Sequence, residues 1–459
     1  MQPLDEIKKY SETVCEQIRW KKAHPVIGEE IENHLCDQRD AYICEGQEEE
    51  TATRNAIIQM GDAVAVGMAL DKTHKPKPQW ALIILALLLM VIGAGASYLT
   101  DTPGDTRGSF SIFPYIAAAA VFFITYFLDF SILGKYPKQS YYLVLVISVL
   151  GVLQSSRIIG RAWFVLGPYS VSLAYLSLIF PLTYSLFLYA MRNKGVRGIL
   201  CCGLGYLPYA VILLLIPSTT GFILFTLTTF ILLGIAVARG WFGVSKKTGM
   251  LLVLLPGACS AGLTCIWFFQ NAYRISRLST LLNPYSDSRG YQIVLIRELM
   301  SNAAFIGKGS VPRQYGENVL SMSYFGNDFI LTTMAHQWGW AAFFGVVMIF
   351  TAFSVLGFLY VSRQKSVLGS MVSMAILLTF IMQTVIYIAG NLGYGLLSVL
   401  SLPLVSYGKA ALLINSGLIG FMLSVFRTGD IMKDSYKPYT KKSSFIAYED
   451  GKLIINFKG

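Results

Sequence analysis

Long runs of hydrophobic residues alternate with short polar stretches from about residue 80 to residue 427. A helix needs roughly 20 apolar residues to cross a bilayer, and most of these runs come close to that length. The pattern therefore predicts an all-α polytopic membrane protein with about ten transmembrane helices. The predicted spans are residues 80–99, 112–130, 140–154, 171–190, 198–217, 219–238, 248–269, 338–361, 367–390 and 409–427.

The first 76 residues follow a different pattern. Their apolar residues recur at helical spacing among many polar ones, which predicts a small cytosolic domain of three or so helices. The stretch has no apolar core of a signal peptide, so we expect no cleavable signal and assign membrane insertion to the first span. The apolar positions of the predicted helices are Ile18, Val26, Ile31, Leu35, Ala56, Ile57 and Met60.

These patterns divide the chain into three predicted parts. Residues 1–76 form the helical prefix domain, residues 77–430 form the ten-span membrane domain, and residues 431–459 form a cytosolic tail. In the tail, FIAYEDGKLIINF places two strand-forming runs on either side of Asp-Gly, which favours a β-hairpin.

The distribution of basic residues predicts the orientation in the membrane. The loops GKYPK, RNKGVR, RGWFGVSKK and SRQK would all lie on one side, together with the Lys-rich segment KDSYKPYTKK of the tail. Loops rich in Lys and Arg remain in the cytoplasm. We therefore expect a multi-pass protein of the bacterial plasma membrane with both termini in the cytoplasm.

Composition supports the membrane assignment and removes other classes of function. Of the 459 residues, 54% are hydrophobic and 14% are charged, against about 25% charged in soluble domains. The basic loops account for the net charge of +11, and no stripe of basic and aromatic residues points to a nucleic-acid partner. The sequence contains no spacing typical of zinc sites or of phosphate-binding glycine loops.

The orientation places one long segment, residues 270–337, on the external face as a large extracytoplasmic loop between spans seven and eight. A connection of this length is usually functional. Its cations suit an anionic lipid head group such as pyrophosphate, and a carboxylate beside them can take a proton from a hydroxyl nucleophile. Its charged and amide side chains include Arg274, Arg277, Asp287, Arg289, Lys308, Arg313, Gln314 and Asp328.

The residues alone leave two classes of protein open. Asp287 has the surroundings of a turn-forming aspartate, and Arg277 and Lys308 are of a type that often anchors a protein at the membrane interface. On composition, an enzyme and a transporter of lipid-linked precursors explain this segment equally well. Against a transporter, no inverted repeat is evident and the polar residues gather in one loop instead of at the bilayer midplane.

Several passages resemble the SEDS family (shape, elongation, division and sporulation), also called the FtsW/RodA/SpoVE family. Their joint order over residues 80 to 430 is more specific than any one passage. Residues 1–76 fall outside this resemblance and look like the short helical domains that precede various membrane proteins of Gram-positive bacteria. The passages are RLSTLLNPYSDSRGYQ, FIGKGS, NDFILTTMAHQWGW, SLPLVSYGKAALLINSGLIGFMLSVFR with GNLG upstream, and GRAWFVLG.

The resemblance implies a peptidoglycan glycosyltransferase that polymerises lipid II in cell shape, division or sporulation. It implies Asp287 as general base, with Arg277 and Lys308 holding the undecaprenyl pyrophosphate leaving group. A class B penicillin-binding protein is the implied partner. A divalent cation, Mg²⁺ or Mn²⁺, could share the cationic role, although no carboxylate cluster marks a metal site. The other implied substrate-binding residues are Arg161, Gln292, Asp328, Ser406 and Tyr407.

The sequence departs from the family pattern at several charged positions. Charged residues inside a membrane are usually functional. Their replacement leaves open a non-catalytic member that acts as a scaffold or sensor in envelope assembly, with the N-terminal domain as its working part. The departures are Leu173, Ala174 and Tyr175 for a Pro-Ser-Glu segment, Leu178 for the lysine that follows it, IPSTTG at 216–221 without the family's aspartate, His336 and Gln337 for paired glutamates, and Lys409 for a glycine.

Overall fold

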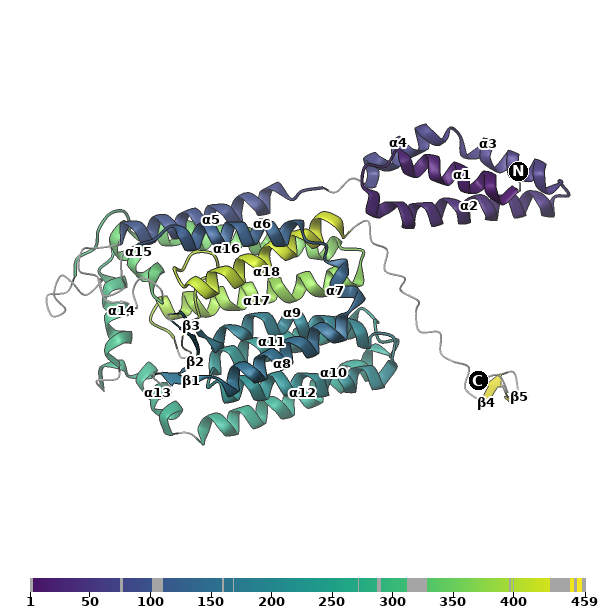
Figure 1. The fold of residues 1–459 in the computed structure, drawn as a ribbon. Helices are drawn as coiled ribbons and strands as arrows, with labels where there is room; N and C mark the ends of the chain where they lie inside the picture. Colours follow the sequence, from purple (N-terminus) through teal and green to yellow (C-terminus); the bar gives the residue numbers. More distant parts are fainter. Residues whose placement is uncertain are drawn as a thin grey trace. The chain divides into compact units, whose positions relative to one another are not determined.

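The structure, a computed structural model, divides into two compact units after Pro78 (Figure 1). We call residues 3–74 the N-terminal unit and residues 79–429 the membrane unit. The three-part division of the chain into residues 1–76, 77–430 and 431–459 stays a prediction. The structure describes residues 3–74, 77–100, 110–158, 161–167, 169–270, 272–286, 290–311, 328–395, 398, 400–429, 446–449 and 452–455.

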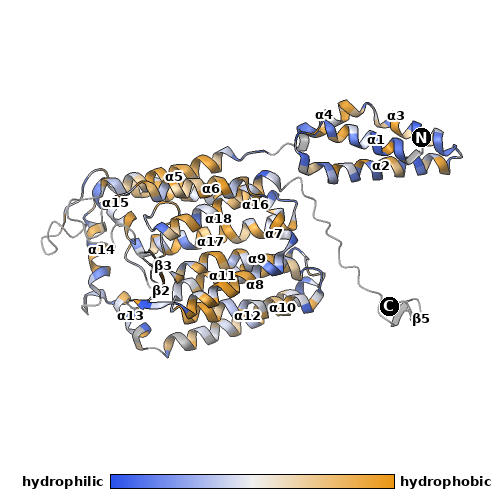
Figure 2. Cartoon of the chain, viewed as in Figure 1, coloured by the Kyte–Doolittle hydropathy of each residue, from blue (hydrophilic) through white to orange (hydrophobic). Residues whose placement is uncertain are grey.

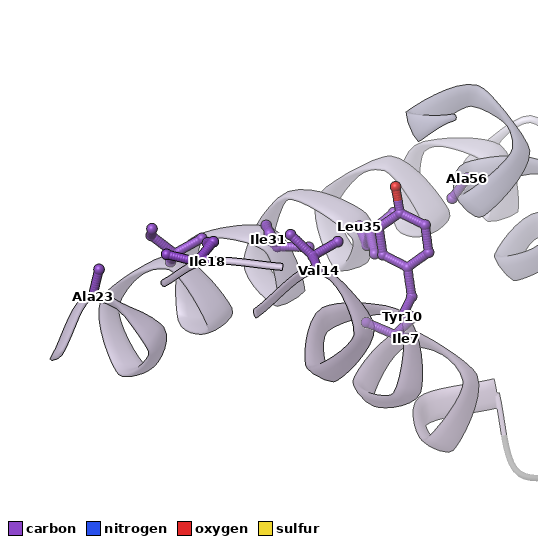
Figure 3. Packing of buried hydrophobic residues seen from close by; sticks show 9 residues of the cluster. Ile7, Tyr10, Val14, Ile18, Ala23, Ile31, Leu35 and Ala56 are labelled. Carbon is purple, nitrogen blue, oxygen red and sulfur yellow. The ribbon is translucent and has the colours of Figure 1, made fainter. Parts of the chain in front are cut away.

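The N-terminal unit is a bundle of four α-helices around one apolar core. Ile7 and Val14 from α1 and Leu35 from α2 are almost completely buried there (Figure 3). Of the apolar positions that predicted these helices, Val26 is different because its side chain is 42% exposed. The elements are α1 (Pro3–Glu16), the 3₁₀ turn η1 (Lys21–Ala23), α2 (His24–Cys44), α3 (Glu49–Met60) and α4 (Ala63–His74).

The membrane unit confirms the predicted all-α polytopic fold. Among its described residues, eight helices are long and apolar enough to cross a bilayer, and two shorter apolar helices, α6 and α8, match the remaining predicted spans (Figure 2). These ten helices are α5 (Trp80–Leu99), α6 (Phe113–Phe127), α8 (Pro137–Leu153), α9 (Leu176–Met191), α10 (Gly195–Leu215), α11 (Thr219–Ala238), α12 (Lys246–Phe269), α16 (Trp340–Arg363), α17 (Val367–Asn391) and α18 (Lys409–Thr428).

Burial separates the centre of the membrane unit from its periphery. Within its apolar window, α17 is 67% buried and α18 is 72% buried, whereas α16 is 28% buried. The centre comprises α9, α11, α17 and α18, and α9 packs against α8, α10, α11 and α17. An apolar helix face that no protein covers in a spanning segment is a face for lipid chains.

Aromatic side chains join the helices around α9. Phe180 of α9 stacks on Tyr209 of α10 with 4.1 Å between ring centroids, and the Tyr209 hydroxyl donates to the Tyr141 carbonyl of α8 at 2.9 Å. In return, the Tyr141 hydroxyl donates to the Gly205 carbonyl at 2.6 Å. These buried hydroxyl groups are therefore satisfied, as burial of a tyrosine requires.

The first two spans contact a segment near the end of the chain. A Cβ on Gly93 of α5 would lie 2.3 Å from the Val405 carbonyl oxygen, so only glycine permits this approach. The Tyr115 hydroxyl of α6 donates to the same oxygen at 2.9 Å. Sequence positions almost 300 residues apart thus meet inside the membrane unit.

A small antiparallel sheet between α8 and α9 was not predicted. It contains β1 (Ser156–Ile158), β2 (Arg161–Leu166) and β3 (Tyr169–Ser172) in that order. The predicted fourth span, 171–190, starts too early, because β3 and the 3₁₀ turn η2 (Leu173–Tyr175) come before α9. Such short strands give too little periodicity to separate them from the end of an apolar helix.

Two shorter features complete the described chain. The helix α7 (Ser131–Lys135) connects α6 to α8. In the tail, β4 (Ile446–Glu449) pairs antiparallel with β5 (Lys452–Ile455), and Glu449 lies opposite Lys452. This register agrees with the hairpin predicted there.

Candidate functional site

The long connection between α12 and α16 is mostly helical where it is described. It contains α13 (Ala272–Leu282), the 3₁₀ turn η3 (Pro284–Ser286), α14 (Tyr291–Ser301) and α15 (Ile330–Trp338). These elements lie at the end of the membrane unit that also carries β1–β3 (Figure 1). Motifs far apart in the sequence therefore gather at one end of the helices.

Asp287, the predicted base, lies outside the described residues, as do Arg289, Arg313 and Gln314. The described chain ends at Ser286 before this residue and resumes at Gly290 after it. A Cβ on Gly290 would come within 1.9 Å of the Pro284 carbonyl oxygen, so glycine is required where these flanks meet. The glycine of the motif NPYSDSRG is therefore required on steric grounds.

The other predicted residues of this motif differ in exposure. Arg277 is half-buried on α13, and its side chain has no hydrogen bond or ion pair with the described residues. Gln292 is exposed in the first turn of α14. Burial lowers the pKa of Arg274, one turn before Arg277, although an arginine remains charged throughout the physiological range.

Arg297 of α14 connects the long connection to α17, a role that the sequence did not reveal. Its Nε donates to the Gly393 carbonyl at 3.0 Å and its Nη2 donates to the Leu281 carbonyl at 3.4 Å. Its guanidinium also lies 5.0 Å from the Tyr394 ring centroid. One side chain therefore joins the end of α13, the middle of α14 and the segment after α17.

The motif FIGKGS presents Lys308 at the surface. Gly307 has φ +94°, a backbone conformation that favours glycine, and a Cβ on Gly309 would lie 2.6 Å from the Asn302 carbonyl oxygen. The two amides donate to α15, from Gly307 to Trp338 and from Gly309 to His336, at 3.2 and 2.7 Å. The two glycines thus have steric reasons, and Lys308 between them is exposed.

His336 is completely buried on α15 beside this motif. Among the described residues, neither ring nitrogen has a hydrogen bond of good geometry. Burial lowers the pKa of His336 and the charge of Lys308 lowers it further, while the backbone of Ser310 opposes them. The imidazole is therefore neutral at pH 7, and its burial keeps it from touching a substrate hydroxyl in this conformation.

A buried hydrogen-bond network holds the beginning of α15 against α17. The Thr332 amide donates to Oδ1 of Asn391 at 3.0 Å, and the Thr332 hydroxyl donates to the Asn391 carbonyl at 2.8 Å. Nδ2 of Asn391 donates to the Asp328 carbonyl at 3.1 Å, and the Ile330 amide donates to the Tyr387 hydroxyl at 3.1 Å. The network fixes the backbone of Asp328, whose side chain is half-buried.

Ser406 and Tyr407, from the SYGK motif, face different neighbours. The Ser406 hydroxyl is buried, accepts from the Leu402 amide at 2.9 Å and donates to the Tyr387 hydroxyl at 3.4 Å. It therefore belongs to the α15–α17 network and supports the backbone. The Tyr407 hydroxyl instead accepts from the Ser111 amide at 3.1 Å, next to α6.

The remaining candidates are Arg161 and a metal ion. Arg161 begins β2, and its backbone pairs with that of Ile158. The structure describes the backbone of Arg161 but not its side chain. In the part of the chain that the structure describes, no three His, Cys, Asp or Glu side chains gather closely enough to hold a metal ion. Among the described residues, the groups that could bind a pyrophosphate are therefore cationic side chains, and no cluster there could hold a metal ion.

Sequence reasoning missed Arg297, Tyr387 and Asn391, which position the site. A lone arginine in the apolar run IVLIRELM was one available signal for Arg297. The GNLG passage contains Asn391, but its resemblance to the family does not identify the partners of that side chain. The partners of these side chains are mostly backbone groups, which no residue pattern identifies.

Comparison with known proteins supports the fold and the family. A probable peptidoglycan glycosyltransferase FtsW of Pseudoalteromonas translucida is 27% identical over 397 residues, which cover 80% of this chain and 94% of that protein. The protein of the same name from Haemophilus ducreyi is 24% identical over 368 residues, which cover 75% of this chain and 88% of that one.

Solved structures share the fold at low sequence identity. A chain of a peptidoglycan synthase complex, studied for the coordination of polymerization and crosslinking, has a TM-score of 0.61 at 22% identity and covers 78% of this chain and 99% of its own. The rod shape determining protein RodA of Thermus thermophilus has a TM-score of 0.52 at 17% identity, with 77% and 97% covered. Residues 76–430, well over half of the chain, match the family of cell cycle proteins that is named for FtsW, RodA and SpoVE. The chain therefore belongs to the FtsW/RodA/SpoVE family of cell cycle proteins.

Proposed function

We propose that this protein is a peptidoglycan glycosyltransferase that polymerises lipid II at the external face of the bacterial plasma membrane. Family membership and the names of its relatives support the reaction class. The observation that carries the proposal is the exposed Lys308, held between two sterically required glycines on the surface of α15. An exposed cation on a held backbone at the end of a membrane unit suits the pyrophosphate of a lipid carrier.

The proposed step is a displacement at the anomeric carbon of the growing glycan. The Asp287 carboxylate takes the proton from the 4-hydroxyl of the acceptor lipid II, and that oxygen forms the new glycosidic bond. The bond from the anomeric carbon to undecaprenyl pyrophosphate breaks, and the electron pair leaves with the pyrophosphate. Arg277 and Lys308 stabilise its growing charge, and Arg161, Gln292 and Asp328 contribute to binding the lipid-linked substrate.

Ser406 and Tyr407 support the site less directly. Ser406 holds the backbone around α15 through Tyr387, while Tyr407 lies against the beginning of α6. A divalent cation is not assigned a step, because the described residues do not fit one. The expected partner is a class B penicillin-binding protein that cross-links the new strand, and both termini are expected in the cytoplasm.

A non-catalytic scaffold or sensor is the second candidate function. Leu178, where the family has a lysine, is 1% exposed within α9, so this position carries a buried apolar side chain in place of the charge. His336, where the family has a glutamate, is buried and neutral. These two replacements favour altered or absent catalysis.

The decisive experiment is polymerisation of purified lipid II by the full-length protein, alone and with candidate penicillin-binding proteins. We expect glycan strands from the wild type, and a loss of about 10²- to 10⁴-fold in Asp287→Asn, since a positioned base contributes that much. The matched control is Asp5→Asn, an exposed aspartate of the N-terminal unit, which should leave the rate unchanged. Equal rates for wild type and Asp287→Asn would exclude Asp287 as the general base. The absence of product with every partner would favour the non-catalytic scaffold or sensor.

A further inference from the structure

The N-terminal unit carries a groove of about 700 Å³ between α2 and α4. Helix α1 packs against both of these helices, whereas α2 and α4 meet each other little. Figure 1 shows α1 between them. Ile27 and Ile31 from α2 line the groove together with Val66 and Leu70 from α4. The volume lies in the range of sites that bind ligands or peptide side chains.

One wall of the groove is unusually apolar for a surface helix. Residues 63–70 of α4 read AVAVGMAL, without a polar side chain over two turns. Val66 and Leu70 line the groove and are half-buried, whereas the exposed Val64 and Met68 lie outside its lining. A helix that is apolar on every side is normally buried. The half-exposed Val66 and Leu70 therefore leave an apolar strip of α4 along the groove.

The opposite wall is acidic. Glu29 and Asp37 of α2 line the groove two turns apart, and no lysine or arginine is among the lining residues. The whole domain shares this sign: residues 1–76 contain 15 acidic and nine basic side chains, a net charge of −6, while the complete chain is +11. The groove is thus an apolar surface with one negative edge.

We propose that this groove binds a basic amphipathic helix of a partner protein. The apolar stripe of the partner helix lies on Val26, Val66 and Leu70, and cations along one flank face Glu29 and Asp37. Because eight residues of an α-helix span about 12 Å, the matching cations lie two turns apart. Helix binding in an apolar groove is a common mode of recognition. Anionic lipid is disfavoured as the occupant, since it would meet the acidic wall.

The test uses the full-length protein in nanodiscs of phosphatidylcholine, which carries no net charge. The probe is a fluorescent 18-residue helical peptide of leucine and lysine, with its lysines along one flank, and binding is read as anisotropy. Empty nanodiscs give the lipid background. We expect saturable binding that the double variant Glu29→Lys/Asp37→Lys weakens about tenfold, since two attractions become repulsions.

The matched control is Glu12→Lys/Glu45→Lys, which reverses two exposed acids of the same unit outside the groove. This control should bind the peptide as the wild type does. A peptide of leucine and glutamate should show the opposite preference and bind the Glu29→Lys/Asp37→Lys variant better, which also demonstrates that the variant is folded. Unchanged lysine-peptide binding by that variant would overturn the proposal.

The apolar contact is tested by Val26→Gln. Val26 lines the groove but is 42% exposed, so the substitution should leave the circular dichroism unchanged while it weakens peptide binding. If wild-type protein instead self-associates and Val26→Gln abolishes that association, the occupant is a second copy of this chain and the proposal is wrong. The test is independent of polymerase activity, so neither result depends on the proposed reaction.

Discussion

The two halves of the connection between α12 and α16 are held to different degrees. Every residue of α15 from Ile330 to His336 is buried, and hydrogen bonds from residues 304–309 and from α17 hold that helix. On the other side, the apolar window of α12 is only 12% buried, and Arg277 on α13 is half-buried. The fold by itself therefore fixes the neighbours of Lys308 more firmly than those of Arg277.

Removing the side-chain amide of Asn391, which holds the beginning of α15, should have the largest effect on stability. Asn391→Leu leaves the buried Thr332 amide without its acceptor and the Asp328 carbonyl without its donor, while the Thr332 hydroxyl keeps the main-chain carbonyl of residue 391. We expect a loss of about 3 kcal/mol. The thermal unfolding midpoint in detergent measures this loss. Asn302→Leu is the matched control, since this amide is exposed, and it should change stability by less than about 0.5 kcal/mol. Equal midpoints for both variants would show that the network does not stabilise α15.

Removing the contacts that hold α13 and α14 to the segment after α17 should have the second largest effect. Arg297→Met removes the hydrogen bonds to Gly393 and Leu281, and charged hydrogen bonds contribute about 2 kcal/mol each. Hydrogen exchange should rise in α13 and α14 while α15 stays protected. Arg297→Lys should not rescue this protection, because an ammonium cannot reach both carbonyls in the fork geometry. Full protection in Arg297→Lys would show that charge alone suffices.

The stability of the half that contains α15 should also depend on pH, through His336. Its folded-state pKa is lowered, so the unfolded chain binds the proton first as the pH falls below about 6.5. Stability from the neutral imidazole is complete above that pH and is lost as the pH falls through the folded pKa. The unfolding midpoint should therefore drop between pH 7.5 and 5.5 in the wild type and drop less in His336→Gln. His34→Gln, an exposed histidine, should keep the wild-type dependence.

The smallest effect on stability is expected in the other half. Arg277→Ala should move the unfolding midpoint hardly at all, because no described residue pairs with its guanidinium. Its lipid II polymerisation should nevertheless fall, since the proposal assigns this cation to the leaving group. A stability loss like that of Asn391→Leu would contradict the difference between the halves. Unchanged polymerisation would remove Arg277 from the site.

Sequence information was sufficient for the spans and insufficient for the contacts that position the site. Apolar runs predicted the long helices because span length is set by the bilayer. The strands from Ser156 to Ser172 were missed because strands of three to six residues carry little pattern. Resemblance pointed to Gly307 and Gly309, and only coordinates gave the steric reasons. The backbone partners of Arg297 could not be predicted, because carbonyl groups are the same at every residue.

The contact of Gly93 and Tyr115 with Val405 has a consequence for biosynthesis. The first two spans enter the membrane early, but the carbonyl that they pack against is made almost 300 residues later. Until that segment leaves the ribosome, the narrow surface around Gly93 has no protein to cover it. The nascent chain therefore carries α5 and α6, which contact each other, without this later partner through most of translation. The end of the bundle that carries the site closes only when synthesis is nearly finished.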